Sequence, residues 1–191
     1  MCIGSGWVAG RSAREDLDGL AAPRVDAAEV AALRRDSYRT LNGKASARSD
    51  ALLRKLQTVM FAYDVSVWKR GTRLERALGE IAGLRAELAE LLAPDTHELV
   101  RLTETEAMVL AAEIILGASL FREESRMNHF REDFDFRDDA NWLCWVDVTD
   151  AGGAPAFAKT PIPTPLYPLE PASGSAAGAA EAVRSAAIKT L

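Results

Sequence analysis

The sequence predicts a mainly α protein, in which short helices precede a three-helix bundle of spectrin-like antiparallel topology and a small β-hairpin follows it. Three observations support this prediction. Apolar residues recur at three- and four-residue steps through the middle of the chain, as on buried helix faces. The connections in this region are short, which favours antiparallel neighbours. After residue 141 the pattern changes to β-forming residues separated by turn-forming glycines.

Two short helices are expected in the N-terminal part of the chain. Residues 6–20 are predicted to form the first, entered through a Gly-Ser-Gly turn at 4–6. Asp26 is placed to cap the second, which should run to about Tyr38. Residues 1–45 are therefore separated from the bundle that follows.

The three long helices are expected at about 49–68, 72–92 and 97–126, since each carries an apolar stripe. The centre of the last one is apolar nearly all round, so we expect it to be buried between its neighbours. Glu113 interrupts this apolar centre, and a buried carboxylate there needs a cationic partner.

The hairpin is expected from residues 142–149 and 156–160, joined by a turn rich in glycine. Four prolines between 161 and 168 then favour an extended segment. The Ala, Gly and Ser composition of 171–191 predicts a flexible tail. Residues 46–170 accordingly form the predicted bundle with its hairpin.

Composition excludes several classes of function. The net charge of −5 provides no basic surplus for a nucleic-acid partner. Cys2 and Cys144 lie far apart, match no metal-ligand spacing and indicate the reduced thiols of a cytoplasmic protein. No apolar run is long enough for a membrane span, and the first residues lack a signal-peptide pattern. We therefore expect a cytoplasmic chain without membrane insertion.

The densest group of chemically capable side chains lies between residues 122 and 142, a range that we call the signature segment. We expect its arginines to form bidentate pairs with carboxylates and to fix the path of a non-helical segment across the helices. The residues assigned to this structural or interface role are Glu124, Arg126, His129, Arg131, Asp133, Asp138, Asp139 and Trp142.

A catalytic interpretation of the same segment is weaker. Ser125, His129 and Asp133 are four residues apart, but spacing alone supplies neither the contact of base with nucleophile nor an oxyanion hole. The acidic residues and the histidine also lack the spacing of a helical metal site. We therefore assign no catalytic and no metal-binding residue.

The run Glu124-Ser-Arg-x-x-His-x-Arg-x-Asp133, followed by Asp138-Asp-x-x-Trp142, resembles the C-terminal signature of the fumarate reductase, succinate dehydrogenase and adenylylsulfate reductase flavoproteins. The resemblance extends from about residue 52 to about residue 163. The Asp95-x-His-Glu-Leu99 opening of the last long helix is similar to the adenylylsulfate reductase branch. Met127 departs from the family, because many members have glycine there.

The resemblance implies the C-terminal helical domain of an FAD-dependent oxidoreductase, as a fragment or a split subunit. FAD would be bound mainly by a flavin domain outside this sequence, and an iron–sulfur subunit is a further implied partner. No catalytic residue of the family falls on this sequence, so the isolated chain is not expected to turn over substrate.

The residues implied to touch the cofactor are Gly4, Ser5 and Gly6, at the start of a helix whose free N–H groups suit a flavin carbonyl. Residues 4–9 also match the letters of a dinucleotide fingerprint, but no strand precedes them, so a complete Rossmann site is not expected. An ordinary helix start explains the same letters. The alternative function is a helical interaction or adaptor protein without a redox role.

Overall fold

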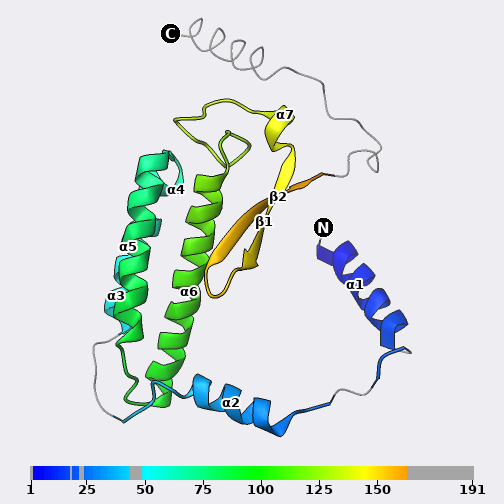
Figure 1. Cartoon of the computed structure of the whole chain (residues 1–191), viewed down its shortest axis with the longest axis vertical. Helices are drawn as coiled ribbons and strands as arrows, with labels where there is room; N and C mark the ends of the chain where they lie inside the picture. The colour runs from blue at the N-terminus through cyan, green and yellow to red at the C-terminus, as the bar shows by residue number, and fades with distance from the viewer. Residues whose placement is uncertain (1, 18, 22–23, 44–48, 163–191) are drawn as a thin grey trace, which may run out of the picture. The chain divides into compact units, whose positions relative to one another are not determined.

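The structure is a computed structural model that describes residues 2–17, 19–21, 24–43 and 49–162 (Figure 1). By its internal contacts the chain divides into two units, residues 1–39 and 40–191, and each is considered by itself. The predicted tail at 171–191 lies outside the described residues.

The first unit consists of two helices, α1 (Cys2–Leu17) and α2 (Ala27–Ser37). Asp26 caps α2 as predicted, since its Oδ1 accepts a hydrogen bond from the backbone N of Ala28 at 2.7 Å. None of the α2 residues is buried, and every described side chain of α1 is exposed. Neither helix thus has an apolar core of its own.

The predicted turn at residues 4–6 is wrong. The helix α1 begins at Cys2, so Gly4, Ser5 and Gly6 lie within its first turns and not before them. A continuous helix satisfies the backbone of Gly6 internally, and glycine is tolerated in a helix at a modest cost.

In the second unit, α3 (Ser49–Met60), α5 (Gly71–Ala89) and α6 (Thr96–Phe121) contact one another, and the short α4 (Tyr63–Ser66) packs against α3 and α5 (Figure 1). Their facing sides form one apolar core, which includes Leu52, Leu56, Val59, Val65, Leu74, Ala77, Ile81, Leu84, Leu88, Leu102, Val109, Ala112 and Leu116. The mainly α prediction is confirmed. The finer expectation of a spectrin-like antiparallel bundle stays a prediction.

Two helix starts are held together at the lower end of this unit. Asp95 caps α6 by accepting from the backbone N of Glu98 at 2.8 Å. The Glu98 carboxylate in turn accepts from the backbone N and the hydroxyl of Ser49, at 2.9 and 2.6 Å, and these bonds lower its pKa. The Glu98 carboxylate therefore lies at the N-terminal end of α3, where the partial positive charge of the helix stabilises an anion.

Two of the long helices are shorter than predicted. The helix expected over 49–68 ends at Met60, because Ala62 has an extended backbone that redirects the chain into α4. The helix expected over 97–126 ends at Phe121, where Arg122 becomes extended and the signature segment begins. Side chains from distant parts of the segment bind the last carbonyls of α6, so local periodicity does not predict this end.

The hairpin prediction is confirmed. Strands β1 (Cys144–Asp150) and β2 (Pro155–Pro161) pair antiparallel, and Gly152 and Gly153 adopt positive φ angles of 74° and 94° in the turn. Phe157 of β2 lies directly over Gly117 of α6: a Cβ at Gly117 would come within 2.5 Å of the Phe157 ring. Glycine is therefore required there for the hairpin to approach α6.

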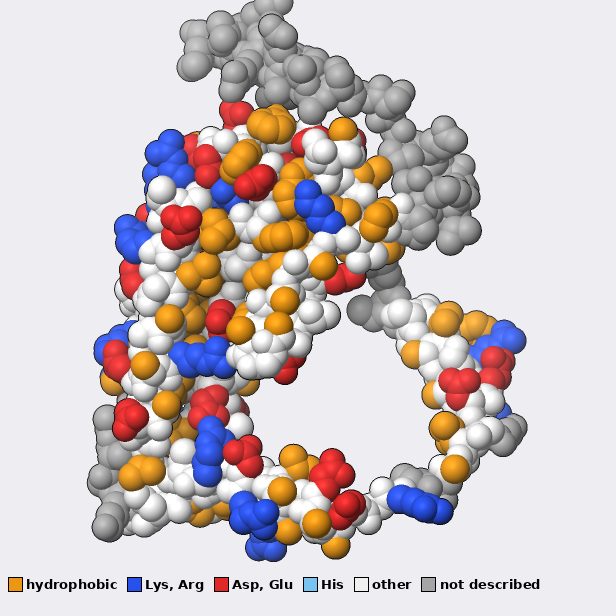
Figure 2. Space-filling model, viewed as in Figure 1, with side chains coloured by type: hydrophobic (Ala, Val, Ile, Leu, Met, Phe, Trp, Pro, Cys, Tyr) orange, Lys and Arg blue, Asp and Glu red, His pale blue; other side chains and the backbone are white. Residues whose placement is uncertain are grey.

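The prediction that α6 is buried all round is wrong on one side. One side of the helix packs in the core, but on the other side several apolar side chains remain exposed within the described structure, with the polar Thr103 and Glu104 among them. The apolar residues of this exposed side, which we call the α6 face, are Val100, Ala107, Met108, Leu110, Ala111 and Ile115. Figure 2 shows hydrophobic side chains gathered on the surface over α6 and the hairpin.

Glu113 does find the predicted cationic partner. Arg85 of α5 donates to its Oε2 at 2.9 Å and also reaches the carbonyl of Gly153 in the hairpin turn at 3.1 Å. Through these two hydrogen bonds Arg85 connects α5 to α6 and to the hairpin. The Glu113 carboxylate is only partly buried, so this connection lies at the surface.

Candidate functional site

The signature segment leaves the C-terminal end of α6, crosses the N-terminal end of α5, forms the short helix α7 (Asp139–Trp142) and leads into β1 (Figure 1). The structure places all eight predicted structural residues on or beside these helix ends. They form three connected groups, around Glu124, around Arg131 and around Trp142.

Glu124 has no exposed surface and is the acceptor at the centre of the first group. Arg126 binds it through two nitrogens, Nε at 2.7 Å and Nη2 at 2.9 Å. The backbone N of Asp138 donates to it at 2.9 Å, and Arg122 adds a further ion pair. A buried carboxylate is expensive unless it is paired and fully hydrogen-bonded, and both conditions are met here.

Arg126 extends this group to the start of α7. Its Nη2 also donates to Oδ1 of Asp139 at 2.6 Å, and Arg137 binds the same carboxylate at 2.7 Å. The hydrogen bond from Arg137, followed by that from Arg126, holds the pKa of Asp139 below its usual range. Asp138 caps α7 through the backbone N of Asn141 at 3.1 Å.

Arg131 and Asp133 form the second group, which joins two helix ends of opposite polarity. The two residues make a bidentate pair at 2.8 and 2.9 Å, and Arg131 is 2% exposed. The Arg131 Nη1 donates to carbonyls at the end of α6, those of Ser119 (2.9 Å), Leu120 (3.0 Å) and Arg122 (3.2 Å). A cation thus caps the negative end of α6.

Asp133 completes the pair from the other side. Its Oδ2 accepts from the backbone N of Gly71, the first residue of α5, at 2.8 Å. The Arg131 hydrogen bonds, followed by that of Gly71, hold the pKa of Asp133 well below its usual range. A Cβ at Gly71 would lie 3.1 Å from this oxygen, so glycine leaves the room that the contact needs. The anion lies at the positive end of α5.

His129 lies beside this pair, with its Nε2 3.2 Å from the carbonyl of Arg122. A carbonyl only accepts, so Nε2 carries the proton in this hydrogen bond. Burial lowers the pKa of His129, and the charges of Lys69 and Arg131 lower it further. These effects favour the neutral ring, which the hydrogen bond to Arg122 holds beside the end of α6.

Trp142 is the centre of the third group and is buried. The Lys159 ammonium lies 3.3 Å from its ring centroid, and Phe121 contacts it edge to face at 5.7 Å between centroids. Arg122 donates to the carbonyls of Trp142 (3.1 Å) and Cys144 (2.7 Å). Trp142 thereby joins the end of α6 to both strands of the hairpin.

The catalytic interpretation of the segment gains no support from this geometry. The Ser125 hydroxyl donates to the carbonyl of Phe134 at 2.8 Å and accepts from the backbone N of Arg131 at 2.9 Å. His129 and Asp133 are engaged with α6 and α5 instead. The three side chains therefore make the hydrogen bonds of a fold-stabilising turn and not those of a triad.

Within the described ranges, no group of three or more His, Cys, Asp and Glu side chains is arranged to hold a metal ion. In the same part of the chain, no helix is both long and apolar enough to cross a membrane.

Sequence reasoning missed three contributors to the site. These are Arg122, Gly71 and Lys159, to which the sequence patterns assign no role. Gly71 is 62 residues from Asp133, and no local spacing connects two positions so far apart. Lys159 pairs with Trp142 only because the hairpin folds back.

The predicted flavin-contact residues lie in the other unit, in α1. Gly4, Ser5 and Gly6 are exposed, and a Cβ built at Gly4 or Gly6 would meet no atom within 4 Å. Their backbone is therefore accessible from outside, as a contact with a flat ring would require.

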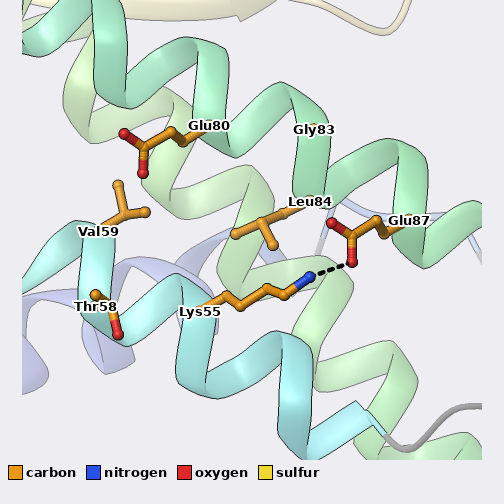
Figure 3. Close-up of a pocket in the computed structure, with 7 residues that line it drawn as sticks. All are labelled: Lys55, Thr58, Val59, Glu80, Gly83, Leu84 and Glu87. Atoms are coloured by element: carbon orange, nitrogen blue, oxygen red, sulfur yellow. Dashed lines mark hydrogen bonds and ion pairs between the residues drawn. The ribbon is translucent and has the colours of Figure 1, made fainter.

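A groove of about 350 Å³ separates α3 from α5 (Figure 3). Val59 and Leu84 face into it, and Lys55 spans its edge to reach Glu87 at 2.6 Å. Both charged side chains are about half exposed, so this surface ion pair contributes little. The groove holds no arrangement of groups suited to catalysis.

Comparison with known proteins identifies relatives of the second unit. Residues 53–173 match the family described as fumarate reductase flavoprotein C-terminal. An uncharacterized FAD-dependent oxidoreductase of Methanocaldococcus jannaschii is 30% identical over 129 residues, which are 68% of this chain and 23% of that protein. The chain thus spans about a quarter of the length of this relative.

Solved structures give the same result. Adenylylsulfate reductase from the hyperthermophile Archaeoglobus fulgidus superposes with a TM-score of 0.66 and 28% identity, covering 78% of this chain and 27% of that one. The apo Sdh1 complex of Mycobacterium smegmatis gives a TM-score of 0.70 over 83% of this chain and 28% of that one, at 22% identity. At that identity the second likeness shows the fold alone.

Proposed function

Because the chain belongs to the fumarate reductase flavoprotein C-terminal family, we propose that it is the helical domain of a larger FAD-dependent oxidoreductase and packs against the flavin domain. The flavin domain is either part of the same polypeptide or a separate subunit. Its docking surface on this chain is the α6 face.

The α6 face is the observation that carries this proposal. Four of its large apolar side chains, Val100, Met108, Leu110 and Ile115, are between 40% and 56% exposed. A helix whose centre is hydrophobic all round is normally buried, and the exposed apolar group at 107–115 is of the kind that marks an interaction surface. A covering domain would remove these side chains from water at about 25 cal/mol per Å² of apolar area.

The first unit supports the same proposal. Trp7, Val8 and Leu17 of α1, together with Val30 and Leu33 of α2, are exposed although they are apolar. A pair of helices without a core of its own gains stability only by packing against something else. We therefore propose that residues 1–45 belong with the flavin domain, as its last helix and a connection to the bundle.

FAD would be held mainly by the flavin domain, where it supplies hydride or electron transfer. The contribution of this chain would be a contact from the start of α1. Gly4, Ser5 and Gly6 fit that role because their small side chains let a flat ring approach the first turns of α1, and the N-terminal end of a helix is electropositive. The relative in M. jannaschii is named an FAD-dependent oxidoreductase, which supports this cofactor.

The signature segment would act at a distance from the chemistry. By fixing the ends of α5 and α6 to α7 and the hairpin, it would hold the α6 face in place. An iron–sulfur subunit as a further partner and a cytoplasmic location are parts of the same proposal, which rest on the family and on the composition of the chain.

The experiment is a pull-down of the tagged full chain from its native host, followed by an absorption spectrum of the eluate. A co-eluting protein with the bands of oxidised flavin is the expected result. A colourless, solitary chain would contradict the proposal and support the adaptor function instead.

Two matched variants locate the docking surface. Ala107→Glu places a charge on the α6 face, whereas Ala86→Glu makes the same change at an exposed position of α5. Burying an unpaired carboxylate costs several kcal/mol, so we expect Ala107→Glu to weaken flavoprotein capture about a hundredfold or more. Ala86→Glu should capture it like the wild type. Equal capture by both variants would show that α6 is not the docking surface.

A further inference from the structure

A second cavity, of about 330 Å³, lies between α3, α4, α6 and the turn at residues 128–129. One part of its wall is apolar and is formed by Met60, Val65, Ile115 and Leu116. The rest of its lining is polar and consists of Ser66, Lys69, Ser119, Asn128 and His129. The cavity therefore combines an apolar wall with two basic side chains.

Lys69 is the unusual residue in this cavity. It is 8% exposed, and its Nζ donates to the carbonyl of Ser66 at 2.8 Å. Among the ion pairs of the described residues, none includes Lys69; the nearby Glu132 pairs with Arg70 and Arg73 instead. Lysines are almost never fully buried unless they are paired. An ammonium has three donors, and one carbonyl does not offset its charge.

The surroundings of the cavity leave this charge unbalanced. Three cations act on His129, namely Lys69, Arg131 and Arg122. Arg131 is neutralised by Asp133 and Arg122 by Glu124. Lys69 alone of the three has no carboxylate partner within the described structure. Burial lowers the pKa of Lys69, which agrees with an ammonium held in an unfavourable place.

His129 can supply a second donor in the same cavity. Its Nε2–H is used by the carbonyl of Arg122, which leaves Nδ1 on the other side of the ring. A carboxylate beside Lys69 would favour protonation of His129, and the protonated ring donates through Nδ1.

We propose that this cavity receives the carboxylate of a glutamate or aspartate side chain from the domain that covers the α6 face. The apolar part of the wall accommodates the methylene stem, and Lys69 binds the carboxylate. Ile115 belongs both to the cavity wall and to the α6 face, so an inserted side chain would continue from the docked surface. The identity of the occupant as part of the docked domain rests on the function proposed above.

The binding chemistry is tested on the full chain without any partner. Propionate reproduces the end of a glutamate side chain, and the chain contains only two histidines, His97 and His129. Titrating propionate at constant ionic strength, we expect a saturable NMR shift of the His129 C2–H signal and a raised pKa of that ring. The His97 signal should not move, because His97 is about 27 Å away from Ile115 along α6.

Two controls decide between specific binding and a general effect of salt or solvent. Propionamide has the same shape without the charge and should leave the His129 signal unchanged. Lys69→Met keeps the apolar stem but removes the ammonium, and should weaken propionate binding about tenfold or more. A shift of equal size with propionamide, or in Lys69→Met, would overturn the proposal, as would no saturable shift in the wild type.

The stability of Lys69→Met separates a binding role from a structural one. Replacing a buried, unpaired ammonium by an apolar side chain should leave the melting temperature of the isolated chain unchanged or raise it. A marked loss of stability would mean that Lys69 supports the fold, and would overturn the proposal.

The partner test completes the argument. In the flavoprotein pull-down, Lys69→Met should weaken capture about tenfold or more, whereas Lys55→Met, which removes an exposed and paired ammonium, should not. If the wild type captures a flavoprotein and Lys69→Met captures it equally well, only the acidic anchor is contradicted. If the wild type captures none, the proposed function fails, and the propionate result still decides whether the cavity binds carboxylates.

Discussion

The signature segment and the α6 face belong to the same unit, but they differ in how many of their side chains find partners within the described chain. In the segment, Glu124 and Arg131 are buried. Both carboxylate oxygens of Glu124 and all three guanidinium nitrogens of Arg131 have hydrogen-bond partners. On the α6 face, large apolar side chains remain exposed. The difference agrees with the proposal that the segment maintains the fold of this chain and that another domain covers the face.

The largest expected effect comes from breaking the segment at Arg131. Arg131→Ala would leave the carbonyls at the end of α6 and the Asp133 carboxylate without their donor. We expect a loss of about 3–5 kcal/mol in the free energy of unfolding, measured by urea denaturation. Arg70→Ala, at an exposed pair with Glu132, should change stability by about 0.5 kcal/mol or less. Equal losses for the two variants would contradict the central place given to Arg131.

A smaller effect is expected where the hairpin meets α6. Gly117→Ala places a Cβ 2.5 Å from the Phe157 ring, which must move. We expect a loss of about 1–3 kcal/mol, measured by the same denaturation. The matched variant is Gly83→Ala on α5, where a Cβ meets nothing within 4 Å. That change should stabilise the chain by about 0.5–1 kcal/mol. A gain at both glycines would show that the hairpin does not pack on α6 as described.

Acid should weaken the segment before it affects the apolar core. The folded-state pKa of Asp133 is lowered by Arg131 and Gly71, so its contribution to stability is present above the unfolded value of 3.8 and is lost as pH falls below it. Asp133→Asn should therefore flatten the dependence of the melting temperature on pH below about 4. An unchanged acid slope in this variant would show that the carboxylate is not held as described.

The smallest effect is expected at the turn of the segment. Met127 has a φ of 52° and is 95% exposed, between two backbone hydrogen bonds that join Arg126 to His129 at 2.7 and 2.9 Å. Glycine adopts this conformation without a steric penalty, so Met127→Gly should raise the free energy of unfolding by about 0.5–1 kcal/mol. A loss of stability would mean that the methionine side chain makes a contribution that its exposure does not reveal.

Local signals in the sequence predicted the elements whose causes are local. Asp26 and Asp95 cap the helices that follow them, and a glycine-rich turn closes the hairpin. The end of α6 could not be predicted in this way, because Arg131 reaches its carbonyls from a later part of the chain. The contact of Gly71 with Asp133 depends on the packing of α5 and α6 and leaves no trace in spacing.

The exposed side of α6 illustrates a different limit. The apolar sequence of α6 favours burial on all sides and therefore predicts that other helices of this chain bury it. The described residues cover only one side, with α3, α5 and the hairpin. In the proposed function a flavin domain covers the other side, and the pattern of apolar residues in this chain does not identify that domain.

The contact between the α6 face and a flavin domain is tested most directly by photocrosslinking in the native host. A photoreactive amino acid at Met108, which is exposed on the α6 face, is compared with the same amino acid at Ala86 on α5. The account predicts a light-dependent covalent product with a flavin-binding domain from position 108 and none from position 86. A product from position 86 alone, or none from either position, would contradict it.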